Sequence, residues 1–213
     1  MPLHSSTAVF RQVLLSPGPF FTDRSPRTGV GFGVVARVAV AHILVVFAGL
    51  LLVGVRVATL DASVGIGSAV GAVAETVVGE SIVLGILVSV NWLVVSVVLH
   101  APAKVLHGEG TVGDTLFVVA WSSPVALLLP VATLVALVLA VGDTGSAEAA
   151  IRQLDALRGA LDGVGALAAF AVLLWQGTIW VAGLKRTHDM PGELAAIAAF
   201  VTVCLGLLAT LAA

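Results

Sequence analysis

Three histidines in or near the apolar stretches have side chains that could take part in metal binding or proton transfer. His42, His100 and His107 carry imidazole groups, which can bind a metal ion or relay protons. Both roles need acidic residues or further histidines at membrane depth, and the apolar stretches that hold His42 and His100 contain none. His107 follows His100 only after Pro102 and a loop, so helical metal-ligand spacing is absent. We interpret His100 and His107 as packing or interface residues and expect no metal and no cofactor.

Two amides lie within otherwise apolar stretches. Asn91 and Gln176 can each form a hydrogen bond between membrane helices, which would contribute about 0.6 to 2 kcal/mol. Contact with a transported solute is the alternative role for these side chains. We interpret them first as residues that join helices.

Two prolines interrupt the longest apolar stretch. Pro124 and Pro130 should kink a helix there, because each removes a backbone hydrogen bond. Ser122 and Ser123, beside the first proline, can bond to the freed carbonyls. A kinked helix with hydroxyl groups could line a transport path, but prolines also serve packing alone. We expect packing, since no charged residue accompanies the kink.

Recognisable catalytic motifs are missing from the sequence. It contains no G-x-S-x-G, no H-E-x-x-H and no phosphate-binding G-x-x-x-x-G-K-[ST]. Its single cysteine, Cys204, lies in an apolar stretch, so there is no disulfide framework. We therefore expect no enzymatic activity, no catalytic residues and no nucleic-acid partner.

The elements that hold these residues are five long apolar stretches. Hydrophobic residues make up 59% of the chain and charged residues only 10%, against about 25% in soluble domains. About 20 helical residues cross the hydrocarbon core of a bilayer. The sequence predicts an all-α, polytopic membrane protein with five transmembrane helices, at about residues 35–57, 81–102, 115–141, 163–184 and 194–213. A cytoplasmic arm, residues 1–31, precedes this transmembrane domain, residues 32–213.

The N-terminal arm is expected to lie in the membrane interface. Its pattern predicts a short helix over Ala8–Leu15 with one apolar face. Pro17 and Pro19 then stop the helix, which places Phe20 and Phe21 at the depth of the lipid headgroups. A disordered tail is the alternative, because so short a helix is marginal in water.

Two of the connections have patterns of their own. Residues 61–80 are rich in glycine, alanine and valine, and we expect a flexible loop there, with a re-entrant or interfacial segment as the alternative. Residues 148–162 show an apolar stripe opposite charged residues, and Glu148 and Arg152 are spaced i, i+4. This pattern predicts an outer amphipathic helix that runs into the fourth span.

The basic residues predict how the chain crosses the membrane. With a cytoplasmic N-terminus and five spans, the C-terminus lies outside and the basic residues divide seven to three in favour of the cytoplasm. The cytoplasmic residues are Arg11, Arg24, Arg27, Arg37, Lys104, Lys185 and Arg186, and the outer ones are Arg56, Arg152 and Arg158. We expect a multi-pass protein of the cell membrane.

Ordered short motifs resemble the Yip membrane family, in its prokaryotic branch. They are Leu14-Leu15-Ser16-Pro17 with Phe20-Phe21, Gly110 with Gly113-Asp114-Thr115, Ala120-Trp121-Ser122-Ser123-Pro124 with Pro130, and Trp180, Leu184-Lys185, His188 and Met190. The resemblance rests on the order of these motifs along the chain, and it spans residues 9–213. The resemblance implies a five-helix bundle with a cytoplasmic N-terminus.

The resemblance also implies a kind of function. Eukaryotic relatives bind prenylated Rab-type GTPases and act in vesicle trafficking and membrane shaping. This chain departs from their pattern, because its arm is short, lacks the acidic Asp-Leu-Tyr-like segment, and has Trp121 where a tyrosine is more usual. Because of these differences, we do not expect this chain to bind GTPases as the eukaryotic relatives do.

The resulting prediction is a non-enzymatic adaptor or membrane-organising protein. Its expected contact surface for membrane lipids, another membrane protein or a cytoplasmic partner comprises Phe20, Phe21, Lys185, Arg186 and His188. The alternative is a small transporter or channel that uses the kinked third span with Asn91 and Gln176. Self-association is left open.

Overall fold

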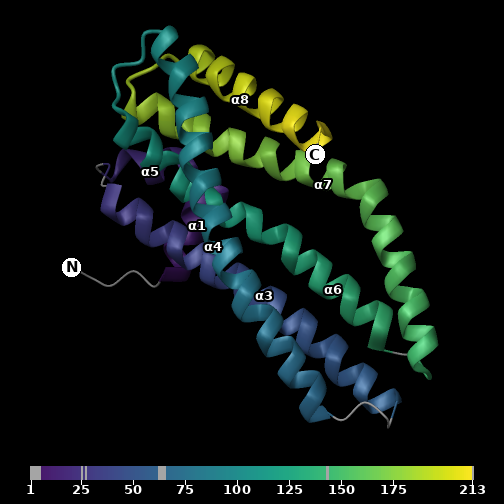
Figure 1. The fold of residues 1–213 in the computed structure, drawn as a ribbon. Helices are drawn as coiled ribbons and strands as arrows, with labels where there is room; N and C mark the ends of the chain where they lie inside the picture. The colour runs from purple at the N-terminus through teal and green to yellow at the C-terminus, as the bar shows by residue number, and fades with distance from the viewer. Residues whose placement is uncertain (1–5, 25, 27, 62–65, 143, 213) are drawn as a thin grey trace. The chain divides into compact units, whose positions relative to one another are not determined.

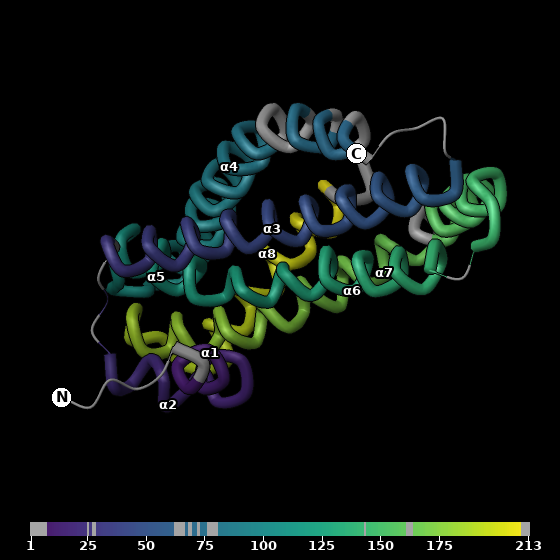
Figure 2. Tube along the Cα trace, turned by 90° about the horizontal axis from the view of Figure 1, so that it is seen from below, coloured from purple at the N-terminus to yellow at the C-terminus, as the bar shows by residue number. Residues whose placement is uncertain are grey.

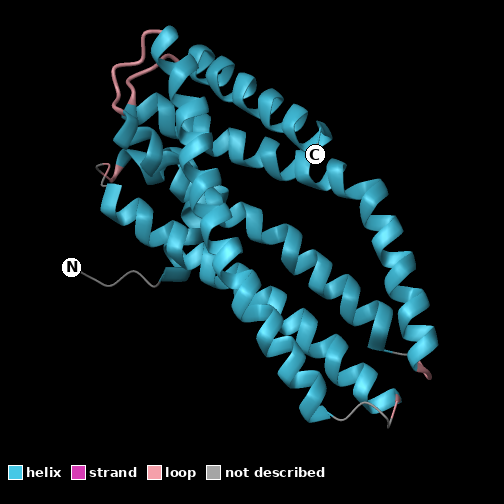
Figure 3. Cartoon of the chain, viewed as in Figure 1, coloured by secondary structure: helices cyan, strands magenta, loops and turns pink. Residues whose placement is uncertain are grey.

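The computed structural model describes residues 6–24, 26, 28–61, 66–142 and 144–212, and every element in them is helical (Figures 1 and 3). The helices are α1 (Ser6–Leu15), α2 (Pro17–Thr22), α3 (Thr28–Leu60), α4 (Ile66–Val105), α5 (Val112–Ser122), the 3-10 helix η1 (Ser123–Leu127), α6 (Leu128–Gly142), α7 (Ala147–Thr187) and α8 (Gly192–Ala212).

Five stretches of these helices are long and apolar enough to cross a membrane. They are Gly29–Leu60, Ser81–Val105, Val112–Gly142, Val164–Thr187 and Gly192–Ala209. Each holds at least 18 residues, close to the roughly 20 that a bilayer requires. The predicted all-α membrane protein with five spans is confirmed.

The chain forms two compact units. Unit 1 contains residues 1–38, 88–126 and 170–213, and unit 2 contains residues 39–87 and 127–169. Each unit is described by itself below.

The core of unit 1 forms around α5. From Thr115 to Ser122 all side chains of this helix except that of Leu116 are buried. Gly31 lets α3 approach α5 closely, since a Cβ there would lie 3.2 Å from the Cβ of Ala120. On another side, Trp92 of α4 donates from Nε1 to the carbonyl of Leu116 at 2.9 Å. The apolar sequence of α5 thus serves protein packing.

In unit 2, α3 runs alongside α6 (Figure 2). A Cβ added to Gly49 would lie 3.3 Å from a methyl group of Leu137, so the glycine allows close packing there. Arg56 then donates from Nε to the carbonyl of Val141 at 3.4 Å and from Nη2 to that of Thr144 at 2.5 Å. A cation thereby satisfies carbonyls at the C-terminal end of α6, where the helix dipole also favours positive charge.

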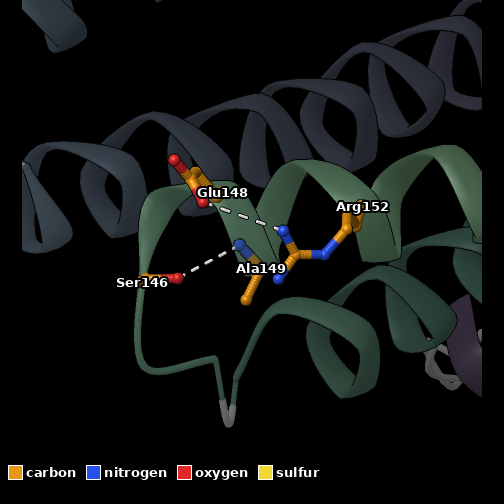
Figure 4. Close-up of polar contacts among 4 residues, drawn as sticks. All are labelled: Ser146, Glu148, Ala149 and Arg152. Carbon is orange, nitrogen blue, oxygen red and sulfur yellow. Dashed lines mark hydrogen bonds and ion pairs between the residues drawn. The ribbon is translucent and has the colours of Figure 1, made fainter.

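The start of α7 matches the predicted amphipathic helix. Ser146 accepts a hydrogen bond from the backbone N–H of Ala149 at 3.2 Å, and Arg152 lies 3.8 Å from Glu148 (Figure 4). Both charged side chains are exposed, so this ion pair contributes only a few tenths of a kcal/mol. The helix continues without interruption from Ala147 into the fourth span, as predicted.

The flexible loop expected at residues 61–80 is a wrong prediction. Helix α4 begins at Ile66 and continues to Val105, while residues 62–65 lie outside the described part of the chain. The glycines that suggested a loop are tolerated because they cost only about 1 kcal/mol each in a helix.

The N-terminal arm contains the predicted helix and a second one. Helix α1 covers the predicted segment, but Val13 is fully buried and Trp175 of α7 donates to the carbonyl of Leu14 at 3.2 Å. Pro17 was expected to end the first helix, and α1 does end at Leu15, but the sequence did not predict that Pro17 opens α2. Proline suits a first helical position, where its missing N–H leaves no bond unmade.

Candidate functional site

Two loops of unit 1 are joined at one end of its helices. Residues 106–111 connect α4 to α5, and residues 188–191 connect α7 to α8. The backbone N–H of Glu109 donates to the carbonyl of His188 at 2.9 Å. We call these loops together the two-loop platform.

Close contact between Gly110 and His188 holds the platform together. A Cβ at Gly110 would lie 2.5 Å from Cγ and 2.6 Å from Nδ1 of the His188 ring. No side chain larger than hydrogen fits there without displacing the imidazole. The spacing of the two loops therefore depends on glycine at this position.

A buried polar network lies beneath the platform. The hydroxyl of Thr115 is 2.9 Å from Nε2 of His188 and 3.0 Å from Nδ1 of His100. It connects α4, α5 and the loop that follows α7. His188 is completely buried, so the network is internal to the unit.

The hydrogen-bond partners of the two ring nitrogens indicate the tautomer of His188. Among the described residues, its Nδ1 atom has no hydrogen-bond partner. A buried N–H without an acceptor costs more than an unpaired ring nitrogen, so we place the proton on Nε2, which donates to Thr115. His188 is then a neutral donor within the core.

The electrostatic environment keeps His188 neutral. Burial, with smaller contributions from the neighbouring His100 and the positive charge of Lys104, lowers the pKa of His188 to about 4, while Asp114 opposes the shift. Near neutral pH the imidazole is therefore uncharged. A neutral His188 fits a structural role, as the donor of a hydrogen bond to Thr115, better than a role in proton transfer.

Local bonds fix both ends of the first loop. Lys104 donates from Nζ to the carbonyl of Gly108 at 2.9 Å. At the other end, Thr111 and Asp114 form a capping box, in which the Thr111 backbone N–H donates to Asp114 at 2.7 Å. The loop is thus defined by backbone and cap contacts.

Lys185 and Arg186 lie in the last turn of α7, directly before the platform. Both side chains are exposed. Their position at a helix C-terminus is electrostatically favourable, because the terminal carbonyls carry partial negative charge. Of the five residues proposed as a contact surface, these two are open to a partner.

The prediction that Phe20 and Phe21 lie on the surface is wrong, because both belong to the core. Phe20 is fully buried, with its ring centroid 4.8 Å from that of Trp121, and Phe21 is 3% exposed beside Phe117. His188 is likewise buried. An aromatic cluster on α5 accepts the arm, so these rings do not lie among headgroups.

The polar residues of the spans have separate positions in unit 1. Gln176 donates to the carbonyl of Ser122 at 3.3 Å, which is the expected bond between helices. Asn91 is exposed on α4, and its side-chain amide makes no hydrogen bond within the described part of the chain. The structure does not bring the two amides together.

The predicted break in the third span is present as η1. This 3-10 helix contains Pro124 and separates α5 from α6. Ser123 donates from Oγ to the carbonyl of Ala120 at 2.6 Å, and Ser122 donates to that of Val119 at 2.8 Å. Pro130 lies in the first turn of α6, where a missing N–H leaves no helical bond broken.

Sequence reasoning did not find the network formed by Thr115 with His100 and His188. Gly110, Thr115 and His188 entered only as parts of a family resemblance, and His100 only as a packing or interface residue, with nothing to connect them. A histidine 73 positions from its threonine partner leaves no local pattern. Among the described residues, no group of three or more His, Cys, Asp or Glu could hold a metal ion.

Comparison with known families identifies one domain in this chain. The Yip1 domain matches residues 11–213, almost the whole chain. No curated protein and no solved structure matches the chain. On the match over residues 11–213, the chain belongs to the Yip1 domain family.

Proposed function

We propose that this Yip1-domain protein is a non-enzymatic adaptor or membrane-organising protein of the cell membrane. Its contact surface is the exposed pair Lys185 and Arg186 beside the two-loop platform. The proposal rests on one observation. The backbone N–H of Glu109 donates a hydrogen bond to the carbonyl of His188 and so connects the two loops.

Rigidity supports a role in recognition. Binding costs less free energy when the contacting groups are already ordered, since less conformational entropy is lost. The platform has this property, because Gly110 packs on His188 and Thr115 anchors the same imidazole from below. Lys185 and Arg186 extend from the helix that leads into it.

The charge distribution supports a cytoplasmic location for the platform. Seven of the ten basic residues lie on one side when the N-terminus is cytoplasmic, and Lys185 and Arg186 are among them. The cytoplasmic leaflet carries anionic lipid, to which each nearby basic residue contributes about 1 kcal/mol. The pair can therefore contact anionic headgroups or an acidic partner.

The chemistry of the polar network favours a structural role. His188 is neutral and fully buried, and its Nε2 proton is engaged by Thr115. A general acid or base must reach a substrate atom, which this imidazole does not.

Cross-linking in the native membrane tests the proposal. The full-length tagged protein and a Lys185→Gln/Arg186→Gln variant are cross-linked, purified and compared by mass spectrometry, and their binding to anionic vesicles is measured in parallel. We expect a partner, vesicle binding or both, reduced in the variant.

A double variant of two other exposed arginines provides the matched control. Arg152→Gln/Arg158→Gln removes the same charge from α7 at a distance of about 30 residues along the helix. This control should retain binding. If the platform variant binds as well as wild type in both assays, Lys185 and Arg186 are not the contact surface.

A further inference from the structure

Helix α4 has two different faces within unit 1. The inner face packs against the rest of the unit through Trp92, Ser96, Leu99 and Ala103, all of them buried. The face that carries Asn91 and Val94 is exposed. Nothing in the described part of unit 1 covers it.

Asn91 is an unusual residue for such a face. It lies close to the middle of the span Ser81–Val105, where lipid offers no hydrogen-bond partner. Its amide is exposed and forms no hydrogen bond among the described residues. Leaving a polar group unpaired in hydrocarbon is costly, so this side chain favours association with another helix.

The residues around Asn91 follow the repeat of paired helices. Asn91, Val94, Val98, Ala101 and Val105 are separated by alternating steps of three and four positions, a period of about 3.5 residues. Val94 is 54% exposed and Val105 is 76% exposed, while Val98 is half-buried. We call this row the Asn91 seam. Small and β-branched side chains with one asparagine are typical of a specific helix pair.

We propose that a second copy of this chain packs on the Asn91 seam, with the two Asn91 amides hydrogen-bonded to each other. Two copies with the same topology place Asn91 at the same depth. A two-fold axis along the membrane normal then brings the amides together. An amide has both donors and an acceptor, so it is complementary to itself. This interface is separate from the two-loop platform and does not depend on the proposed function.

Cysteine cross-linking of the purified full-length protein in lipid vesicles tests the geometry. Cys204 is first replaced by alanine, and single cysteines are introduced by Val94→Cys or Leu93→Cys. Leu93 is the matched control, because it is 48% exposed at the same depth but about 100° around the helix. We expect dimers from Val94→Cys and few from Leu93→Cys. Equal cross-linking at both positions would overturn the proposed seam.

Energy transfer between labelled copies measures the contribution of the amide. Dimer dissociation is followed as the protein is diluted with lipid, for wild type, Asn91→Leu and Asn91→Leu/Leu93→Asn. We expect Asn91→Leu to weaken the dimer about tenfold, and the displaced amide not to restore it. An unchanged dissociation constant, or wild type that stays monomeric at every dilution, would refute the proposal. Leucine is a common residue on lipid-exposed helix faces, so the Asn91→Leu variant should keep its fold.

Discussion

His188 is buried in a neutral state, so its protonation opposes folding of unit 1. Its folded pKa of about 4 lies below the ordinary value of 6.5. The stability that this difference supplies is fully present above pH 6.5 and is lost as pH falls toward 4. The loss amounts to about 3 kcal/mol at most.

Thermal unfolding of detergent-solubilised wild type and a His188→Gln variant checks this effect. The unfolding temperature of wild type should fall more steeply between pH 6.5 and pH 4 than that of the variant. His100, Lys104 and Asp114, whose charges act on His188, are present in both proteins, so a difference between the two pH profiles reports His188. Parallel pH profiles would mean that His188 does not titrate in this way.

Gly110 should tolerate no side chain. A methyl group would lie 2.5 Å from the His188 ring, and overpacking of this kind costs about 1 to 3 kcal/mol. We expect Gly110→Ala to lower the unfolding temperature. Gly159→Ala is the control, because nothing lies within 4 Å of a Cβ there and alanine favours the helix. A Gly110 variant as stable as the control would contradict the tight contact.

Single residues were predictable where their environment is local. Ser122 and Ser123 bond to carbonyls three positions earlier, which the neighbouring proline already indicated. Phe20 and Phe21 were misplaced, because aromatic rings suit both headgroups and protein cores. What decides between them is Trp121, about 100 positions away, and no local pattern contains that information.

At the scale of elements, the hydroxyl group of Ser122 joins α5 to α7, in addition to the bond from Gln176 to the Ser122 carbonyl. Ser122 accepts a hydrogen bond from Nε1 of Trp180 at 2.7 Å, and both side chains are buried. Ser122→Ala leaves the indole N–H unpaired, which should cost about 1 to 3 kcal/mol in unfolding free energy.

The neighbouring serine offers the comparison for this substitution. Ser123→Ala removes a bond to the carbonyl of Ala120, which also accepts from a backbone N–H. Its effect on chemical denaturation should therefore be the smaller. Equal effects would mean that the Trp180 bond contributes little.

The elements themselves were largely predictable. Length and apolar character identify a membrane span without tertiary information, and Pro124 identified the break now seen as η1. The exceptions are the start of α4 and the existence of α2. A glycine-rich stretch was interpreted as a loop in the first case, although α4 begins there. In the second case Pro17 ends α1 as expected, but it also occupies the first position of a new helix, which proline favours.

For the whole molecule, the division of basic residues predicts a cytoplasmic N-terminus and an outer C-terminus. Reporters fused before Met1 and after Ala213 should report opposite sides of the membrane, because an odd number of spans separates them. A reporter after Ala213 that reports the cytoplasm would contradict this orientation. It would also move Lys185 and Arg186 away from the anionic leaflet.

The bond between Glu109 and His188 joins main chain to main chain. Such a bond does not depend on the side chain of Glu109. Many exposed side chains of the two-loop platform can therefore change without changing its shape. Lys185 and Arg186 could be exchanged for other side chains while the scaffold beneath stays the same. A fold built in this way can acquire new partners through few substitutions.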